Sequence, residues 1–173
     1  MDYVQIWIGS DEALEPFDEH MATVRARVGI DDGYELVRPE PIPGLTPHDQ
    51  SNLLRVELAT HNPNLCYVDV DCKLFSVPEM HPSAPYAGKH SYHVSGYLFF
   101  VNGHTATFER IRQRQVRLLE QNAKADIYGR FGVWQLGQTE VFRRVPKECY
   151  RHEYTTLRQR RKSVRLLADT QNG

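Results

Sequence analysis

The sequence predicts a single α/β domain in which a mixed sheet is flanked by helices, and two observations predict it. The chain opens with a strand, a helix and a second strand, an order that favours parallel pairing through a crossover. Another helix then leads into the hydrophobic run Leu65–Cys72, which adds a third strand. At 173 residues, with 40% hydrophobic and 25% charged side chains, the chain has the size and composition of one globular domain.

The first half of the chain is expected to alternate strands with helices. In order, its predicted elements are a strand over 3–8, a helix over 12–28, a strand over 34–37, a proline-rich loop over 39–47, a helix over 48–60 and a strand over 65–72. Asp11 is the expected cap of the first helix, with Pro16 in its first turn. Asp49 or Ser51 is the expected cap of the second helix.

The second half is expected to hold fewer regular elements. They are a loop over 75–90, strands over 91–95 and 96–101, an Asn102-Gly103 turn, a helix over 106–123, a strand over 141–145 and a basic helix over 155–167. Thr105 is the expected cap of the helix over 106–123, and its arginines are expected to form a solvated face. No internal repeat and no second domain is apparent.

Two acidic residues, Asp69 and Asp71, stand inside the hydrophobic run 65–72. If that run is one continuous strand, Tyr67 shares a face with both aspartates, and Cys66, Val68, Val70 and Cys72 form the opposite apolar face. Paired carboxylates repel each other, and burial penalises their charge. A hard divalent cation such as Mg²⁺ or Mn²⁺ relieves both problems. The alternative is an edge strand whose aspartates face water.

Composition and charge narrow the function classes. No apolar run approaches the ~20 residues of a membrane span, and the N-terminus lacks a signal-like stretch, so we expect a cytoplasmic protein. The three cysteines lack zinc spacing, and Cys66 and Cys72 are expected in the core. Residues 141–173 carry nine Lys and Arg against three Asp and Glu. This basic segment could bind an anionic partner or pack on the acidic body.

Three segments together resemble the glycosyltransferases with the DXD sugar-binding region. They are Gln5-Ile6-Trp7-Ile8-Gly9, Ser51-Asn52-Leu53-Leu54-Arg55 and Tyr67-Val68-Asp69-Val70-Asp71, in the family's order over roughly the first 75 residues. The family includes the Och1-type mannosyltransferases and, more distantly, resembles the glucosylating domains of clostridial toxins. Weaker echoes follow at 98–107 and 145–150.

The resemblance implies a small GT-A-like, Rossmann-like domain over residues 1–154, followed by a basic helix or tail over 155–173. It implies transfer of a hexose from a UDP- or GDP-sugar, with retention of configuration, to an acceptor that is a glycan, a protein or a nucleic acid. Asp69 would contact the ribose or sugar, and Asp71 would hold Mn²⁺ or Mg²⁺ on the diphosphate. Trp7 would flank the base, and Arg55 would reach the sugar or phosphate. A core tryptophan and a surface salt bridge are the alternatives for these two residues.

Three departures from the family pattern bear on the site. Asn52 stands where relatives carry an aspartate that bonds the donor sugar, so one acceptor remains and the charge is lost. Relatives place Gly-Gly before the tyrosine, whereas this chain has Pro63-Asn64-Leu65-Cys66. The chain is also short, so the acceptor-binding part must be minimal or come from a homo-oligomer.

The resemblance also implies a further metal ligand from the C-terminal region. His152 is the candidate, with His81, His90 and His93 behind it, although a single histidine is more often structural. The alternative function is a degenerate, transferase-like binding module that uses its basic C-terminal segment on nucleic acid or another polyanion.

Overall fold

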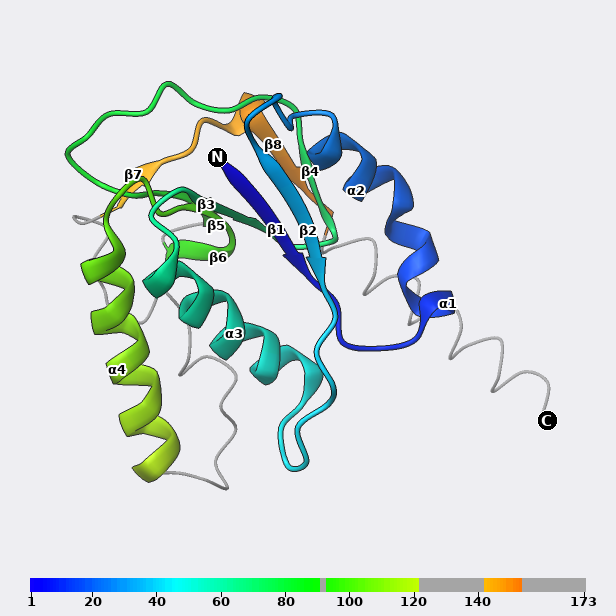
Figure 1. Ribbon diagram of the computed structural model, residues 1–173, viewed down its shortest axis with the longest axis vertical. Coiled ribbons are helices and arrows are strands. Elements are labelled where there is room, and N and C mark those ends of the chain that lie inside the picture. Colours follow the sequence, from blue (N-terminus) through cyan, green and yellow to red (C-terminus); the bar gives the residue numbers. More distant parts are fainter. Residues whose placement is uncertain (91–92, 122–141, 154–173) are drawn as a thin grey trace.

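The computed structural model describes residues 1–90, 93–121 and 142–153 of the chain (Figure 1). Its main sheet has six strands in the order β2-β1-β3-β6-β5-β7. The strands are β1 (Asp2–Ile6), β2 (Gly33–Val37), β3 (Leu65–Val68), β5 (Tyr86–His90), β6 (His93–Phe100) and β7 (Arg143–Arg144). A separate pair joins β4 (Cys72–Leu74) to β8 (Tyr150–His152).

The main sheet is mixed, as the sequence predicts. β1 pairs in parallel with both β2 and β3, whereas β6 runs antiparallel to β3 and to β5. β7 returns to pair in parallel with β5. The carboxyl ends of β1 and β3 therefore lie side by side, along the edge of the sheet that the ends of these strands form.

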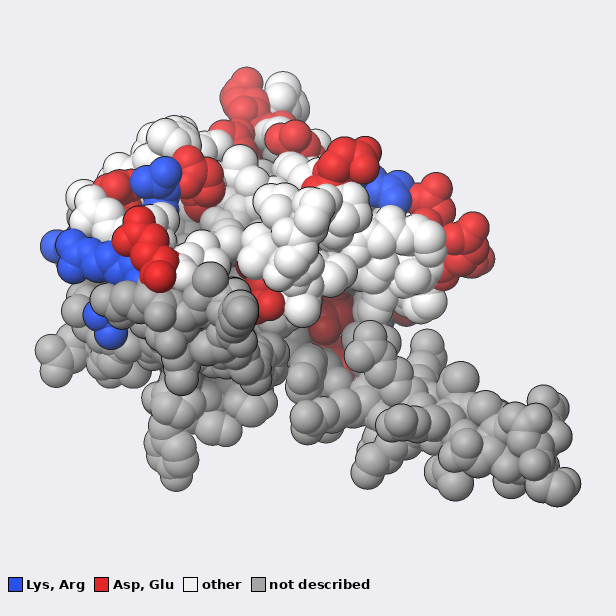
Figure 2. All heavy atoms as spheres, turned by 90° about the horizontal axis from the view of Figure 1, so that it is seen from below, with Lys and Arg blue, Asp and Glu red and all other residues white. Residues whose placement is uncertain are grey.

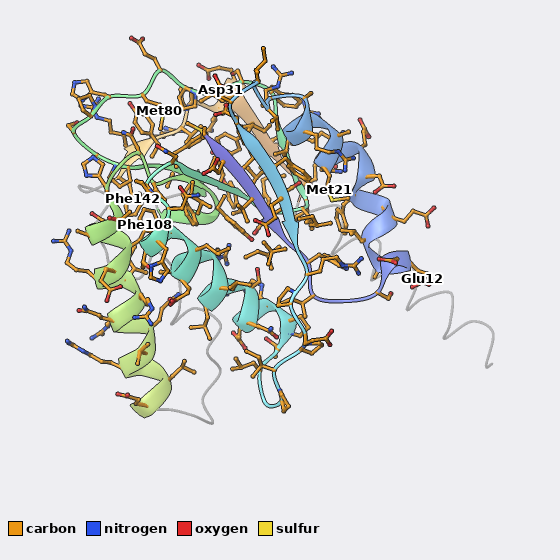
Figure 3. The ribbon with its side chains drawn as sticks, in the orientation of Figure 1. Glu12, Met21, Asp31, Met80, Phe108 and Phe142 are labelled. Atoms are coloured by element: carbon orange, nitrogen blue, oxygen red, sulfur yellow. The ribbon has the colours of Figure 1, made fainter. Side chains whose placement is uncertain are left out.

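Helices and apolar side chains cover both faces of this sheet. The helices α3 (Pro47–His61) and α4 (Thr105–Gln121) lie over one face, and α2 (Asp18–Arg25) lies with β4 and β8 on the other (Figure 1). On the α3–α4 face Val4, Tyr67 and Phe108 share one core, which continues to Phe142 (Figure 3). On the other face Cys66 and Val68 pack with Val24 of α2. The α/β class with a mixed sheet between helices is confirmed.

The helix predicted over 12–28 is interrupted near its start. It consists of α1 (Asp11–Leu14), a 3₁₀ turn, η1 (Glu15–Phe17), and α2, which ends at Arg25. Pro16 explains the break, because its ring clashes with the preceding turn and it lacks an N–H group to donate. Asp11 is the first residue of α1 and not its cap, and Ser10 precedes it without a side-chain capping bond.

The second helix begins one residue earlier than predicted, at Pro47. Its cap is Thr46, so the assignment of Asp49 or Ser51 is wrong. The Thr46 hydroxyl accepts a hydrogen bond from the Asp49 amide at 3.1 Å and donates one to Asp49 Oδ2 at 2.6 Å. Threonine before proline is a strong start signal, because proline at the first helical position loses no bond.

The predicted strand over 65–72 ends at Val68. All four residues of β3 are buried, since both faces of this central strand are covered. Residues 69–71 leave the sheet, and β4 begins at Cys72 in the other sheet. Val70 accordingly packs with Leu14, Phe17 and Met21, apart from Cys66 and Val68. The continuous apolar face expected from alternation is therefore wrong beyond Val68.

The region predicted as a loop over 75–90 contains β5, and the two strands predicted over 91–101 form the single strand β6. β5 was hard to recognise because Tyr86-Ala87-Gly88-Lys89-His90 has a glycine and little β-branched character. Its pairing with β6 shifts register between Ala87 and Gly88. The turn at Asn102-Gly103 is confirmed, with positive φ at both residues.

The described surface carries acidic side chains over several elements. Figure 2 shows one face, on which Asp and Glu appear at both sides and Lys and Arg gather mainly at one. The three cysteines are all free and buried, as the sequence predicts for Cys66 and Cys72. Within the described ranges, no helix combines the length and apolarity needed to cross a bilayer.

Candidate functional site

The site lies where the chain leaves β3 for the second sheet. Three backbone or side-chain bonds hold Asp69 at this point: its amide donates to the Tyr97 carbonyl at 2.7 Å, and its carbonyl accepts from Gln5 Nε2 at 3.3 Å and from the Cys72 amide at 3.0 Å. The last bond closes a turn over 69–72. This turn, rather than strand alternation, brings the Asp69 and Asp71 carboxylates to one side.

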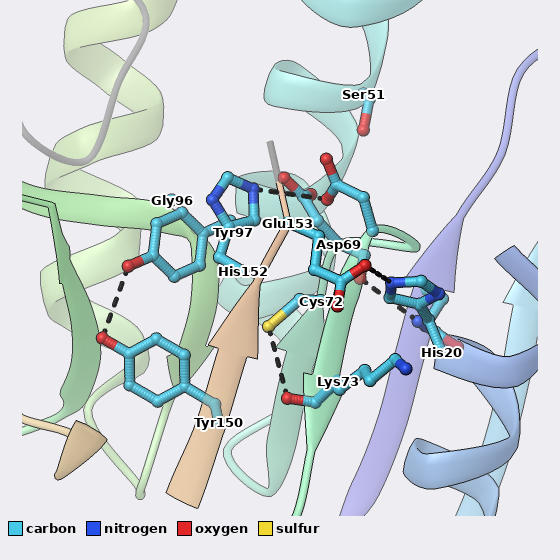
Figure 4. A network of polar contacts seen from close by, with 12 residues as sticks. His20, Ser51, Asp69, Cys72, Lys73, Gly96, Tyr97, Tyr150, His152 and Glu153 are labelled. Carbon is cyan, nitrogen blue, oxygen red and sulfur yellow. Dashed lines mark hydrogen bonds and ion pairs between the residues drawn. The ribbon is translucent and has the colours of Figure 1, made fainter. Parts of the chain in front are cut away.

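The third member of the site comes from the far end of the described chain. β4 pairs with β8 in antiparallel register, with Cys72 opposite His152. This pairing places His152 Nε2 3.4 Å from Asp71 Oδ1. One ligand atom each from Asp69, Asp71 and His152 lies within 4.8 Å of the others (Figure 4). Two carboxylates and one imidazole at this separation can share a single cation.

Two side chains of the protein donate hydrogen bonds to one of the two carboxylate oxygens of Asp69. Arg55 Nη1 donates to Asp69 Oδ1 at 3.2 Å, and the Tyr67 hydroxyl donates to the same oxygen at 2.5 Å. Arg55 Nη1 also donates to the Gly96 carbonyl at 2.6 Å. Arg55 is 4% exposed, so it is a buried partner of Asp69 and not the surface salt bridge considered above.

Burial dominates the electrostatics of this group. Desolvation raises the pKa of the Asp69 carboxyl, the positive charge of Arg55 opposes the rise, and the charge of Asp71 adds to it. Burial also raises the pKa of the Tyr67 hydroxyl well above its ordinary value, with a further rise from the charge of Asp69. Tyr67 therefore stays protonated and acts as a donor. A bound cation would offset the remaining repulsion between the two carboxylates.

His152 is held by ring stacking. Its imidazole lies parallel to the Tyr97 ring, with the ring centres 4.1 Å apart and the planes 8° from each other. The Tyr97 hydroxyl in turn lies 3.3 Å from the hydroxyl of Tyr150. Gly88 makes room for this stack, because a Cβ atom there would lie 2.7 Å from Tyr97 Cε2.

A second contact fixes the end of β8. His20 Nε2 lies 3.0 Å from Glu153 Oε2, and the Glu153 amide donates to the Asp71 carbonyl at 3.2 Å. His20 belongs to α2, so this contact ties the strand that carries His152 to the helix on the same face of the sheet. Figure 4 shows this contact between His20 and Glu153 as a dashed line.

Two residues expected in the site have other described contacts. Trp7 follows β1 at the same sheet edge, but its indole N–H donates to the Ser10 carbonyl at 3.0 Å and its ring packs on Phe17. Asn52 is 2% exposed, and its backbone carbonyl accepts from Gln115 Nε2 of α4 at 3.2 Å. The contacts described for these two residues are with residues other than Asp69, Asp71 and His152.

Of the other histidine candidates, His81 has described contacts away from the site, and the side chains of His90 and His93 are outside the described part of the structure. His81 Nδ1 bonds the Ser83 hydroxyl at 2.9 Å in the loop before β5. His90 and His93 pair with each other where β5 and β6 meet. The basic segment over 155–173, the domain boundary at 154 and the polyanion-binding role fall outside the described residues.

Sequence reasoning did not assign roles to Tyr67, His20 or Glu153. The role of Tyr67 could have been predicted, since it stands two residues before Asp69 and shares its face on an extended backbone. No local pattern predicts the roles of His20 and Glu153, because their contact joins distant parts of the chain.

Comparison with known proteins shows the fold. No family model and no curated protein matches the chain. The apo form of the glycosyltransferase GlyE from Streptococcus pneumoniae TIGR4 superposes with a TM-score of 0.54 at 12% identity, over 84% of this chain and 44% of that one. A second GlyE structure gives 0.54 at 11% identity, over 83% and 44%. An active-site mutant of LgtC gives 0.46 at 10% identity, over 78% and 71%. The chain thus shares a fold with the solved structures of GlyE and spans less than half the length of that protein.

Proposed function

We propose that the protein is a metal-dependent glycosyltransferase that moves a hexose from a UDP- or GDP-sugar to an acceptor. The observation that carries this proposal is the convergence of Asp69, Asp71 and His152 at the carboxyl edge of the sheet. Open α/β sheets bind their ligands at that edge. The glycosyltransferase fold and the order of the three sequence segments support the same reading.

The donor set fits a divalent cation. Asp71 and His152 would supply one oxygen and one nitrogen, and Asp69 would supply a second oxygen. An imidazole in the set favours Mn²⁺ over Mg²⁺, because Mg²⁺ prefers oxygen ligands and keeps its water. When bound, the cation would neutralise the diphosphate and stabilise the leaving nucleoside diphosphate.

The protein's own residues would hold the donor around that cation. Asp71 would orient the diphosphate through the cation, and Asp69 would accept from the ribose or sugar hydroxyls. Trp7, at the same edge of the sheet, would flank the base if its ring turns from Phe17. We propose that the transfer proceeds with retention of configuration.

A calorimetric titration with Mn²⁺, followed by a screen of UDP- and GDP-sugars with and without Mn²⁺, tests the proposal. The wild-type protein should bind Mn²⁺ and release nucleoside diphosphate from at least one sugar only when Mn²⁺ is present. Asp71→Ala should abolish both signals and keep the circular dichroism spectrum. Asp31→Ala, which removes an exposed carboxylate from a distant turn, is the matched control and should change neither. Equal Mn²⁺ binding by wild type and Asp71→Ala would refute the proposed site.

A further inference from the structure

We propose that Tyr67 and Arg55 are positioning residues, which occupy one oxygen of Asp69 so that only the other is presented to the cation and donor. This inference rests on the proposed function and changes the role of Arg55. The resemblance implies that Arg55 touches the donor, whereas the structure directs its guanidinium to Asp69 and to the Gly96 carbonyl.

The two hydrogen bonds described for the Asp69 carboxylate are on the same oxygen. A carboxylate oxygen offers two lone-pair sites, and Oδ1 receives one donor from Tyr67 and one from Arg55. Both sites of Oδ1 are therefore used by the protein. Oδ2 is left as the oxygen that can face a cation.

The two donors are themselves fixed. The Tyr67 side chain is completely buried. Its ring centre lies 5.2 Å from the Arg55 guanidinium carbon and 5.2 Å from the centre of the Phe99 ring, whose plane is inclined by 26°. The same Arg55 Nη1 also donates to the Gly96 carbonyl, and this second bond helps to hold the guanidinium in place. Asp69 thus cannot rotate its carboxylate without breaking two bonds to rigid partners, and the geometry needed for binding exists beforehand.

A second hydroxyl continues the arrangement. Ser51 Oγ of α3 lies 3.5 Å from the Tyr67 hydroxyl, which can accept from it while donating to Asp69. Ser51 and Arg55 are four residues apart on α3 and so lie on one face of that helix. One helix therefore supports Asp69 directly through Arg55 and indirectly through Tyr67.

Two roles of Tyr67 and Arg55, positioning Asp69 or competing with the cation for it, predict opposite changes in Mn²⁺ affinity. If Arg55 and Tyr67 only compete with the cation for Asp69, their removal should strengthen Mn²⁺ binding. If they hold Asp69 in place, their removal should weaken it, and loss of such supporting bonds typically costs about 10- to 100-fold in metal affinity.

The test measures the Kd of Mn²⁺ alone by calorimetry for the 173-residue protein and three variants. Tyr67→Phe keeps the ring and its stacking but removes the donor, and should raise the Kd about tenfold or more. Arg55→Lys keeps the charge but replaces the planar guanidinium whose Nη1 makes both bonds, and should also raise the Kd. Tyr86→Phe is the matched control: Tyr86 is a buried tyrosine whose hydroxyl bonds the Glu79 carbonyl and the His81 amide, away from Asp69, and its Kd should equal that of wild type.

The outcomes separate this inference from the proposed function. Absence of Mn²⁺ binding in the wild-type protein would refute the proposed function and this inference with it. Wild-type binding that is unchanged or tighter in folded Tyr67→Phe and Arg55→Lys would overturn the positioning role and leave the metal site standing. Thermal denaturation of each variant checks that it is folded. If Tyr67→Phe does not fold, the Kd of Mn²⁺ for Arg55→Lys tests the positioning role.

Discussion

At the scale of single residues, the candidate site depends on side chains that do not face a ligand. His152 keeps its place through the parallel Tyr97 ring, and the Tyr97 ring keeps its place because Gly88 has no side chain. The same dependence applies to Asp69, whose direction is set by Tyr67 and Arg55. Substitutions outside the set of ligands should therefore affect cation binding.

Gly88→Ala should move the Tyr97 ring and with it His152. The added Cβ would lie 2.7 Å from Tyr97 Cε2, and a ring stacked in a core cannot shift cheaply. We expect a loss of about 1–3 kcal/mol in the free energy of unfolding and weaker Mn²⁺ binding, measured by urea denaturation and calorimetry.

Gly103→Ala is the comparison for that experiment. Gly103 has φ of +80° with open space around the Cβ position, so alanine there strains only the backbone. It should lower stability without changing the Kd of Mn²⁺. If Gly88→Ala binds Mn²⁺ as wild type does, Tyr97 does not position His152.

At the scale of elements, α3 carries both a strong start signal and the residues that support Asp69. Thr46 caps the helix, and Arg55 and Ser51 lie in its middle. Disturbing the cap should therefore loosen the helix that holds Asp69 in place.

Thr46→Ala should destabilise the protein by about 1 kcal/mol, because the Asp49 amide loses its capping partner. Thr46→Ser retains the hydroxyl and should recover most of that loss. The midpoint and slope of urea denaturation measure both variants. Equal stability of Thr46→Ala and wild type would show that the cap contributes nothing.

The contact between α3 and α4 should depend on pH through one ion pair. Arg112 bonds Glu57, and this bond lowers the pKa of the Glu57 carboxyl below its ordinary value. A carboxyl with a lowered pKa adds stability above its unfolded-state pKa and loses it as the pH falls through the folded-state pKa. Arg112→Gln should therefore lower the urea midpoint slightly at pH 7, and the gap to wild type should narrow as the pH falls below the ordinary pKa of a glutamate, about 4.3.

The stability difference between wild type and Arg112→Gln at low pH distinguishes the effect of charge from that of packing. Both side chains are partly exposed, so the effect at pH 7 should be small. A gap that persists unchanged at pH 3 would mean that Arg112 stabilises the α3–α4 contact through packing and not through the charge of Glu57.

Sequence reasoning succeeded where local patterns determine the structure. Residue type and spacing predict the opening strand, helix and strand, the turn at Asn102-Gly103, and the strand over 65–68 that precedes Asp69. β5 was missed because its short, glycine-containing sequence becomes a strand only through its antiparallel partner β6. The end of β3 at Val68 was missed because nothing in 65–72 marks the passage from one sheet to the other.

The candidate site shows the same division between local and distant information. Asp69, Asp71 and Arg55 could be selected from short segments with a recognisable order. That His152 lies beside Asp71 depends on the pairing of β4 with β8, which joins opposite halves of the chain. Asn52 was selected by its position in a motif, yet its described contact is with α4, because that helix packs across this part of α3.

At the scale of the whole molecule, the three candidate ligands connect the main sheet to the small one. Asp69 follows β3, Asp71 precedes β4, and His152 ends β8. A cation bound by all three would link both sheets, and binding to the folded form alone must stabilise it.

Mn²⁺ at a hundredfold excess over its Kd should stabilise the protein by about 2.7 kcal/mol, which corresponds to a rise in Tm of roughly 5–11 °C for a chain of this size. Excess EDTA should reverse the rise. Thermal denaturation with and without Mn²⁺ measures it, and His152→Ala should show a much smaller shift. A shift of the same size in His152→Ala would remove that residue from the set of ligands.

The pairing of β4 with β8 also has a consequence for biosynthesis. A ribosome releases Asp69 and Asp71 long before it releases His152, and domains begin to fold from the N-terminal side as they emerge. The growing polypeptide must therefore carry the acidic pair without its imidazole until translation has nearly reached the end of the described chain. Capture of the proposed cation should thus wait until β8 has been made, so that a product terminated before β8 would lack the complete set of candidate ligands.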